Sequence, residues 1–215
     1  MLQGTTGSLL AVCGLAKAYD GRVIVAGLDL EVEAGSAVAL MGPNGCGKST
    51  VLRCLSGHEQ AAHTTFETAG RPARVHSSAY RRDVFPIFDD FSFFPDITVA
   101  EHLELLAGMY DIPDHEATTA AALTRFGISG VAQQFPTSLS SGQIRRVAFA
   151  AAAIRPWKVL LLDEPEQRLD ADGRLRLVQF LREQLAAGRG LVFATHDAGL
   201  AQLLAASVVT LAHQG

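Results

Sequence analysis

The sequence predicts an α/β fold built on a parallel β-sheet, and three kinds of segment predict it. An apolar run over residues 36–41 leads through a glycine-rich turn into a helical pattern. Two short apolar runs, residues 159–162 and 191–194, are of the kind that parallel sheets bury on both faces. Residues 171–187 place apolar side chains on one helical face and end at Gly188, which indicates a helix packed on that sheet.

The composition is that of one folded globular domain. The chain has 215 residues, of which 48% are hydrophobic and 19% charged, and this length is enough for a single well-buried core. Its formal net charge is −4, and the basic residues form no run longer than an isolated pair, which argues against a nucleic-acid-binding face. We therefore expect one domain over residues 1–215 and no nucleic-acid partner.

Cysteine usage and hydropathy indicate the kind of compartment. Cys13, Cys46 and Cys54 have neither disulfide nor metal-site spacing, which favours reducing conditions. The apolar run at residues 9–12 is too short for a secretory signal, and no apolar run approaches the roughly 18 residues of a membrane helix. Any association with a membrane should therefore come through a partner.

The first part of the chain predicts a small antiparallel layer. Residues 9–15, 23–25 and 28–32 are short apolar or alternating runs, and Asp20-Gly21 marks a tight turn between the first two. Residues 58–78 are polar and predict only weak strands and loops.

The middle of the chain is aromatic and then helical. Residues 84–94 hold five phenylalanines interrupted by acidic residues, and we interpret the part around Phe91 to Phe94 as an exposed docking surface. Thr98 and Glu101 have capping-box spacing at the start of a helix. Two further helices are expected at residues 113–126 and from Leu139 to about residue 154.

These helices predict an insertion within the sheet domain. The sheet core is expected at about residues 1–90 and 155–215, with a mainly helical subdomain at about residues 91–154. In the second half of the core, residues 159–162 end in Asp163 and Glu164, and residues 191–194 end close to His196. Ligands of open parallel sheets bind at the carboxyl ends of the strands, so these side chains are candidates for the site.

The glycine-rich turn fits the phosphate-binding pattern G-x-x-x-x-G-K-[ST], which Gly42, Gly47, Lys48 and Ser49 meet. Its glycines allow the backbone N–H groups to face anionic oxygens, Lys48 adds a positive charge, and the Ser49 hydroxyl is a Mg²⁺ ligand. The helix that follows points its positive end at the same anion. The predicted phosphate-binding residues are Gly42, Pro43, Asn44, Gly45, Cys46, Gly47, Lys48, Ser49 and Thr50.

The order of four further motifs identifies a family. Leu139-Ser140-Ser141-Gly142-Gln143 is followed by Asp163-Glu164-Pro165, then by Leu169-Asp170, and then by His196. From about residue 9 to 211 the chain resembles the nucleotide-binding subunits of ATP-binding cassette (ABC) transporters. The resemblance implies a RecA-like P-loop NTPase core with an antiparallel N-terminal β-layer and an inserted α-helical subdomain.

The resemblance also implies a role for each matching residue. Asp163, with Ser49 and Asp89, matches the Mg²⁺ site, Glu164 polarises the attacking water, and His196 contacts the γ-phosphate while Lys48 binds it. Tyr19 is either an ordinary half-buried tyrosine or the aromatic that stacks on adenine, and the resemblance favours the second reading. The signature residues Leu139, Ser140, Ser141, Gly142 and Gln143 complete the site of the opposite subunit, and Leu169 and Asp170 form the dimer loop.

Three positions depart from the family pattern. The usual glutamine of the loop joining the sheet to the helical part falls at Asp89, or at Asp90 if the alignment slips by one. Aspartate accepts hydrogen bonds but cannot donate them as an amide does. Ser141 stands where glycine is commoner, and Arg168 places a bulky charge in the dimer loop.

The resemblance implies an ATPase that uses ATP and Mg²⁺ and powers transport through separate transmembrane subunits. It would work at the cytoplasmic face of the membrane as a peripheral subunit, paired with a like or unlike second nucleotide-binding subunit. The segment after the signature, Gln143 to Arg146, favours compact exporter-type subunits such as those of haem export. The alternatives are a nucleotide-gated dimerising scaffold and a soluble non-transport ABC ATPase with little hydrolysis.

Overall fold

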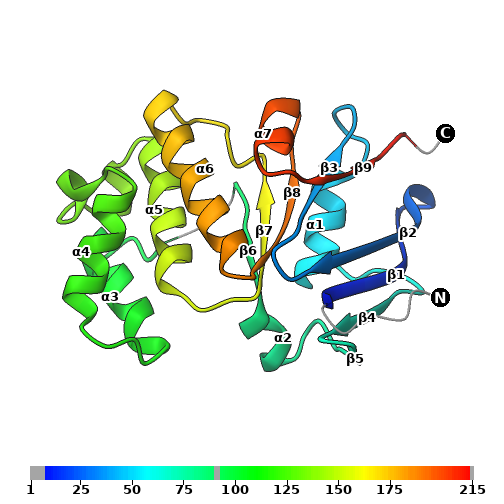
Figure 1. Ribbon diagram of the computed structural model, residues 1–215, viewed down its shortest axis with the longest axis horizontal. Coiled ribbons are helices and arrows are strands. Elements are labelled where there is room, and N and C mark those ends of the chain that lie inside the picture. The colour runs from blue at the N-terminus through cyan, green and yellow to red at the C-terminus, as the bar shows by residue number, and fades with distance from the viewer. Residues whose placement is uncertain (1–7, 90–92, 214–215) are drawn as a thin grey trace. The chain divides into compact units, whose positions relative to one another are not determined.

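The computed structural model describes residues 8–89 and 93–213, and the described chain forms two compact units. The first unit comprises Met1–Pro86, Trp157–Pro165 and Leu181–Gly215, and the second comprises Ile87–Pro156 and Glu166–Phe180. The α/β P-loop architecture expected from the sequence is present, with an antiparallel sheet, a parallel sheet and helices (Figure 1).

The antiparallel sheet of the first unit is built on one long hairpin. Strands β1 (Ser8–Tyr19) and β2 (Arg22–Glu33) pair antiparallel, and Tyr19 faces Arg22 across the turn. Asp20 and Gly21 both have positive φ, at 47° and 81°, as a two-residue turn between twisted strands requires. The short strands β4 (Thr65–Thr68) and β5 (Arg71–Pro72) complete the order β2-β1-β4-β5. The three runs expected here are therefore two continuous 12-residue strands.

The parallel sheet has the strand order β6-β7-β8-β3-β9. Its strands are β6 (Val84–Ile87), β7 (Val159–Asp163), β8 (Gly190–Ala194), β3 (Ala37–Met41) and β9 (Ser207–Thr210). Every residue of β8 is buried, and β3 and β7 are buried except for their last residues. Continuous apolar runs of this kind are what a sheet covered on both faces selects.

Helices flank this sheet. Helix α1 (Lys48–Ser56) packs on β7 and β8, and the short helix α7 (Ala198–Leu203) begins at Asp197, whose side chain accepts hydrogen bonds from two backbone N–H groups. Helix α2 (Ser78–Asp83) is capped by the hydroxyl of Ser77 and was not predicted from the sequence.

The second unit is mainly helical. It contains α3 (Val99–Met109), α4 (His115–Arg125), α5 (Ser141–Ile154), the first part of α6 (Ala171–Ala186) and the 3₁₀ turns Ser129–Val131 and Pro136–Ser138. Its core includes Phe126, whose ring centroid lies 6.0 Å from that of Phe149 and 5.3 Å from that of Phe180. Residues 166–180 therefore group with the helices and not with the sheet core.

The helix starts follow the predicted signals. Thr98 and Glu101 form the capping box at α3, since the Glu101 carboxylate accepts from the Thr98 N–H at 2.8 Å and the Thr98 hydroxyl accepts from the Glu101 N–H at 3.2 Å. Gly127, just beyond α4, has a φ of 66°, which suits the left-handed residue that ends a helix. No helix of the described residues is both long and apolar enough to span a bilayer.

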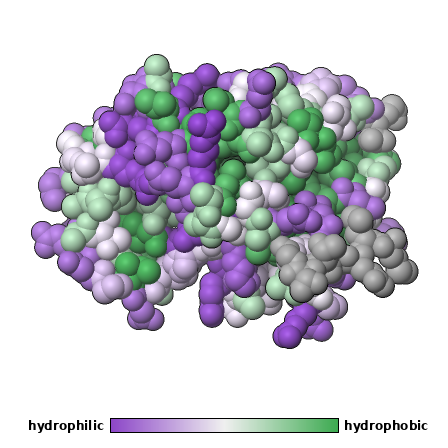
Figure 2. Space-filling model, viewed as in Figure 1, coloured by the Kyte–Doolittle hydropathy of each residue, from purple (hydrophilic) through white to green (hydrophobic). Residues whose placement is uncertain are grey.

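The phenylalanine-rich stretch is divided between core and surface. Val84, Phe85, Ile87 and Phe88 are buried, so its first part forms strand β6 and cannot be a docking surface. Phe94 is 60% exposed, whereas Phe91 lies outside the described residues. Near α3 and α4 the surface carries hydrophobic areas, whereas hydrophilic side chains cover the outward face of α6 in the same view (Figure 2).

Candidate nucleotide-binding site

The glycine-rich turn connects β3 to α1 and depends on its glycines. Gly42, Gly45 and Gly47 have φ values of 149°, 78° and 103°, which side chains disfavour. A Cβ on Gly42 would lie 2.2 Å from the carbonyl oxygen of Leu211, and one on Gly47 would lie 2.9 Å from Cγ2 of Ile24. Conformation therefore favours glycine at all three positions, and space also does so at Gly42 and Gly47.

The N-terminus of α1 is prepared for an anion. Gly47 is the N-cap residue and supplies no side-chain hydrogen bond, and the first turn, which is fully described, contains no acidic residue. The first N–H groups of a helix need partners and carry the positive end of its dipole. A phosphate is therefore a suitable cap for this helix.

Lys48, His196 and Glu164 form a connected cluster in the first unit. The Lys48 ammonium donates to the carbonyl oxygens of Gly42 at 3.0 Å and Pro43 at 3.2 Å, and lies 3.0 Å from Nε2 of His196. The same Nε2 lies 3.2 Å from Oε1 of Glu164. A single ring nitrogen either accepts from Lys48 or donates to Glu164, so the tautomer of His196 decides which hydrogen bond is made.

The backbone holds these groups at the carboxyl ends of the parallel strands. Asp163 ends β7 and is paired with Ala194, which ends β8. Glu164 has a φ of 43°, a left-handed conformation that is uncommon outside glycine, and its N–H donates to the Ala194 carbonyl at 2.9 Å. Strained residues of this kind cluster at functional sites, which fits the candidate role of Glu164.

Two of the three predicted Mg²⁺ ligands fit a magnesium site. The Ser49 hydroxyl on α1 and the Asp163 carboxylate at the end of β7 are oxygen donors on two elements that pack together. Mg²⁺ takes few protein oxygens and keeps water and substrate phosphate as its other ligands. Within residues 8–89 and 93–213, no group of three or more His, Cys, Asp or Glu side chains is arranged to hold a metal ion.

The third predicted ligand, Asp89, faces two arginines of the second unit. Its Oδ2 accepts a hydrogen bond from Nη2 of Arg168 at 3.1 Å, and its Oδ1 lies 3.6 Å from Nη1 of Arg145. Both oxygens are thus already near positive charges supplied by the chain. The alternative alignment at Asp90 lies outside the described residues.

Tyr19 lies at the end of β1, and the residue is 41% exposed. Its hydroxyl donates to Glu59, and the Lys17 ammonium lies 4.8 Å from the ring centroid. Partial burial and the neighbouring Glu59 raise the pKa of the Tyr19 phenol. Burial opposes ionisation of Glu59, yet hydrogen bonds from Tyr19 and Lys17 hold the pKa of its carboxyl below the usual value. No pattern in the sequence indicated Glu59 as a partner of Tyr19.

The signature residues lie at the start of α5 in the second unit. The Ser140 hydroxyl accepts from the Gln143 N–H at 3.3 Å, and the Gln143 side chain accepts from the Ser140 N–H at 2.8 Å, so the two form a capping box. A Cβ on Gly142 would lie 2.6 Å from the carbonyl oxygen of Arg168. The glycine therefore allows the predicted dimer loop to approach the predicted signature.

The predicted dimer loop is anchored to α5 as well. Asp170 accepts from the Gly173 N–H at 2.8 Å and from the Arg146 guanidinium, and these contacts hold the pKa of its carboxyl below the ordinary value. Signature and dimer-loop residues together line a pocket of about 520 Å³. The residues that line it are Gly127, Ile128, Gly130, Val131, Ser140, Ser141, Gly142, Gln143, Arg146, Arg168 and Asp170.

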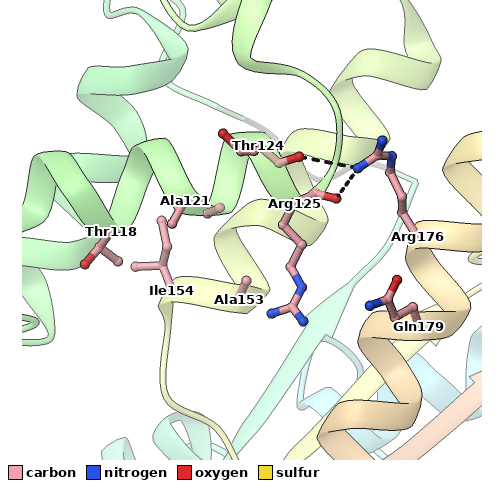
Figure 3. A pocket seen from close by; sticks show the side chains of 9 residues that line it. Thr118, Ala121, Thr124, Arg125, Ala153, Ile154, Arg176 and Gln179 are labelled. Carbon is pink, nitrogen blue, oxygen red and sulfur yellow. Dashed lines mark hydrogen bonds between the residues drawn. The ribbon is translucent and has the colours of Figure 1, made fainter.

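A second pocket of the helical unit, of about 600 Å³, contains none of the predicted site residues. Ala121, Ala153 and Ile154 form one side of it, and Arg125, Arg176 and Gln179 lie on the other (Figure 3). Nη1 of Arg176 donates to the carbonyl oxygens of Thr124 at 3.4 Å and Arg125 at 3.0 Å (Figure 3). Arg176 therefore secures the C-terminus of α4.

Comparison with known proteins is consistent with this geometry. The family model "ABC transporter" matches residues 25–167. The chain is 36% identical over 215 residues to an aliphatic sulfonates import ATP-binding protein, SsuB 2, of Xanthomonas axonopodis pv. citri, covering 99% of this chain and 71% of that protein. It is 32% identical over 209 residues to a spermidine/putrescine import ATP-binding protein, PotA, of Spiroplasma citri, covering 95% of this chain.

The chain spans 59% of the length of the Spiroplasma protein, so that relative contains sequence with no counterpart here. Among solved structures, an ATP-binding subunit of an ABC transporter superposes with a TM-score of 0.85 at 27% identity, over 94% of this chain and 85% of the other. Both curated relatives are named for import, so the lean towards an exporter type is not supported. With its phosphate turn, its signature at the start of α5 and these matches, the chain belongs to the ABC transporter family of ATP-binding proteins.

Proposed function

We propose that the chain binds ATP with Mg²⁺ at the carboxyl ends of β3, β7 and β8 and hydrolyses it to drive transport through separate transmembrane subunits. One observation carries this proposal. Lys48, His196 and Glu164 form a connected cluster beside a helix N-terminus that is suited to a phosphate. Phosphoryl transfer depends on positioning and charge stabilisation, and this cluster supplies both.

Each residue of the cluster has a distinct part in the reaction. The Lys48 ammonium, which donates to the carbonyls of Gly42 and Pro43, exchanges these neutral acceptors for phosphate oxygens, which form stronger charge-assisted bonds. His196 then contacts the γ-phosphate through Nε2. Glu164, released from His196, accepts a hydrogen bond from the attacking water and orients it in line with the bond that breaks. Ser49 and Asp163 would hold Mg²⁺, which would supply positive charge beside the phosphates.

A second copy, or an unlike nucleotide-binding subunit, is the proposed partner at the signature face. Ser140, Ser141, Gly142 and Gln143 stand at the start of α5, where the helix dipole favours an anion brought by another subunit. ATP between the two subunits would hold them together, and hydrolysis would release them. Leu139 precedes this helix start, and Leu169 and Asp170 would lie in the same interface.

The proposed membrane partner docks on the apolar surface of the helical unit. Phe94, Leu105 and Met109 are 60%, 48% and 70% exposed, and large exposed apolar side chains in one unit mark interaction surfaces. We place the subunit at the cytoplasmic face of the membrane as a peripheral component. Import is the proposed direction, because both relatives described above carry import in their names. Their substrates differ, so neither is assigned to this chain.

The test is steady-state phosphate release by the chain assembled with its membrane subunits. Glu164→Gln keeps the size of the side chain and removes its charge, and we expect turnover to fall by roughly 100-fold or more while ATP binding persists. Glu183→Gln, the same change at an exposed position of α6, is the matched control and should leave turnover unaltered. Equal turnover of wild type and Glu164→Gln would overturn the proposed mechanism.

One observation favours a second candidate, a nucleotide-gated dimerising scaffold with little hydrolysis. Asp89 replaces the expected glutamine and is engaged by Arg168 and Arg145. In that case wild-type chain would dimerise with ATP and release phosphate no faster than Glu164→Gln. A soluble ABC ATPase without a transport role is distinguished by the absence of a membrane protein after copurification in mild detergent.

A further inference from the structure

The Asp89 carboxylate joins two segments of the second unit that are far apart in sequence. One oxygen accepts from Arg168, 79 positions along the chain, and the other lies 3.6 Å from Arg145 on α5. Arg168 lies in the predicted dimer loop, next to Leu169, and Arg145 lies two residues after the signature. Asp89, Arg145 and Arg168, which we name the Asp89 triad, therefore link the predicted dimer loop to the helix that carries the signature.

Arg145 is the fixed member of the triad. Its side chain is only 5% exposed, and its guanidinium lies 5.6 Å from the ring centroid of Phe149, one turn further along α5. A buried guanidinium is a fixed positive charge, and Oδ1 of Asp89 lies 3.6 Å from it. Asp89 is therefore held at α5 by an anchor that cannot turn towards solvent.

Arg168 is the exposed member, and its backbone is strained. Its φ is 63°, in the left-handed region that a side chain disfavours, and its side chain is 47% exposed. Its carbonyl oxygen lies where a Cβ on Gly142 would be 2.6 Å away, so the strained backbone touches the signature. The hydrogen bond to Asp89 therefore restrains the side chain of Arg168, the residue whose carbonyl approaches Gly142.

The next arginine of α5 secures the other end of the same loop. Arg146 donates to Asp170 and, at 3.3 Å, to Asp172. Neighbouring residues of one helix thus hold the loop at two points, Arg145 through Asp89 and Arg146 directly. A loop fixed at two points has few ways to move relative to the signature.

We propose that Asp89 is a positioning residue, which through Arg168 and Arg145 sets the dimer loop against the signature, and that it is not a ligand of Mg²⁺. The expected effect on turnover rests on the proposed function, whereas the geometry of the three residues does not. Oδ2 of Asp89 accepts a hydrogen bond from Arg168, and Oδ1 lies 3.6 Å from a second guanidinium, that of Arg145. A carboxylate placed between two guanidinium groups is already neutralised by the chain and has less attraction for a metal ion. Loss of either Asp89 or Arg168 should therefore have the same consequence.

The first test measures geometry without activity. Hydrogen exchange of the backbone amides at residues 166–173 is followed by mass spectrometry in the purified full chain and its variants. Asp89→Asn and Arg168→Met should each speed exchange there by about threefold or more, because an ordering contact is lost. Asp83→Asn and Lys158→Met break an ion pair of 2.8 Å in the first unit and serve as matched controls that leave residues 166–173 unchanged. Unchanged exchange in both triad variants would overturn the inference, whether or not the chain hydrolyses ATP.

The second test is a double-mutant cycle on turnover by the assembled transporter. Each single variant should lower kcat on the order of fivefold with little change in KM for ATP, and the double variant should be no worse than either single one. The Mg²⁺ concentration for half-maximal turnover should stay unchanged. A raised Mg²⁺ requirement in Asp89→Asn alone, with additive losses in the double variant, would identify Asp89 as a metal ligand and overturn the proposal. Wild-type chain without turnover would instead refute the proposed function and leave the exchange result standing.

Discussion

Replacement of Gly42 by alanine adds a single methyl group and should cause a large loss of stability. Its φ of 149° is nearly restricted to glycine, and an added Cβ would stand 2.2 Å from the Leu211 carbonyl oxygen and 2.8 Å from Sγ of Cys46. To reach ordinary contact at 3.4 Å, the carbonyl would have to retreat by about 1.2 Å. That carbonyl belongs to the backbone just after β9, which is held by a 2.7 Å bond from the Leu211 N–H to Met41.

The expected cost combines two effects. A residue with a Cβ in this backbone conformation costs roughly 1–3 kcal/mol, and overpacking against backbone adds about 1–3 kcal/mol. We therefore expect Gly42→Ala to lower the free energy of unfolding by about 3 kcal/mol or more. Gly21→Ala isolates the first effect, because Gly21 has a φ of 81° but nothing within 4 Å of the added Cβ. This control should cost only about 1–2 kcal/mol.

The assay is equilibrium unfolding in urea, with the free energy extrapolated to water and the slope compared between variants. A Gly42→Ala variant within about 0.5 kcal/mol of Gly21→Ala would refute the argument, since the backbone contact would then carry no cost. A changed slope would show that the denatured ensemble had altered, and the comparison would then use unfolding rates.

Three further predictions concern other parts of the first unit. Folding lowers the pKa of the Glu59 carboxyl, so the stability that Glu59 contributes is present above about pH 4.5 and is lost as the pH falls through the folded-state pKa. The free energy of unfolding measured from about pH 6 to 3 should show this loss in the wild type and less of it in Glu59→Gln. Burial, with Glu59 nearby, raises the pKa of the Cys54 thiol to about 11, so iodoacetamide at about pH 8 should label the partly exposed Cys13 well before Cys54, as mass spectrometry of the native chain would reveal. If Tyr19 stacks on adenine, Tyr19→Phe should bind ATP nearly as wild type whereas Tyr19→Ala should bind on the order of tenfold more weakly, and equal affinities in calorimetry would remove that role.

Local signals in the sequence predicted much of the fold. The glycine turn before Lys48, the capping box at Thr98 and the apolar runs that became β7 and β8 each depend on neighbouring residues alone. Such signals are complete within a few positions, because helix caps and tight turns are built from residues close in the chain. The carboxyl-end placement of Asp163 and His196 followed from the same runs.

Features that depend on distant residues were missed or misread. Strand β6 was not recognised, because its Val84-Phe85-Pro86-Ile87 run continues into further phenylalanines and has no turn signal to separate it. Glu59 lies 40 positions from Tyr19, and Arg168 lies 79 positions from Asp89. No helical or strand periodicity connects residues so far apart, so neither contact could be predicted from the sequence. Arg145 and Arg146 entered the sequence interpretation only as a basic pair and as part of the segment after the signature, although the structure gives each a separate acidic contact.

The helix start after Gly47, which no side chain of the described residues caps, has a consequence for the lifetime of the protein. A ligand that completes this helix binds the folded chain and not the unfolded one, so it adds about 2.7 kcal/mol to stability at 100 times its dissociation constant. The nucleotide concentration in the cell would then govern how fast proteases degrade the subunit as well as how fast the subunit hydrolyses ATP. Starvation would deplete the motor itself, and purification without nucleotide would yield a chain that unfolds at a lower temperature.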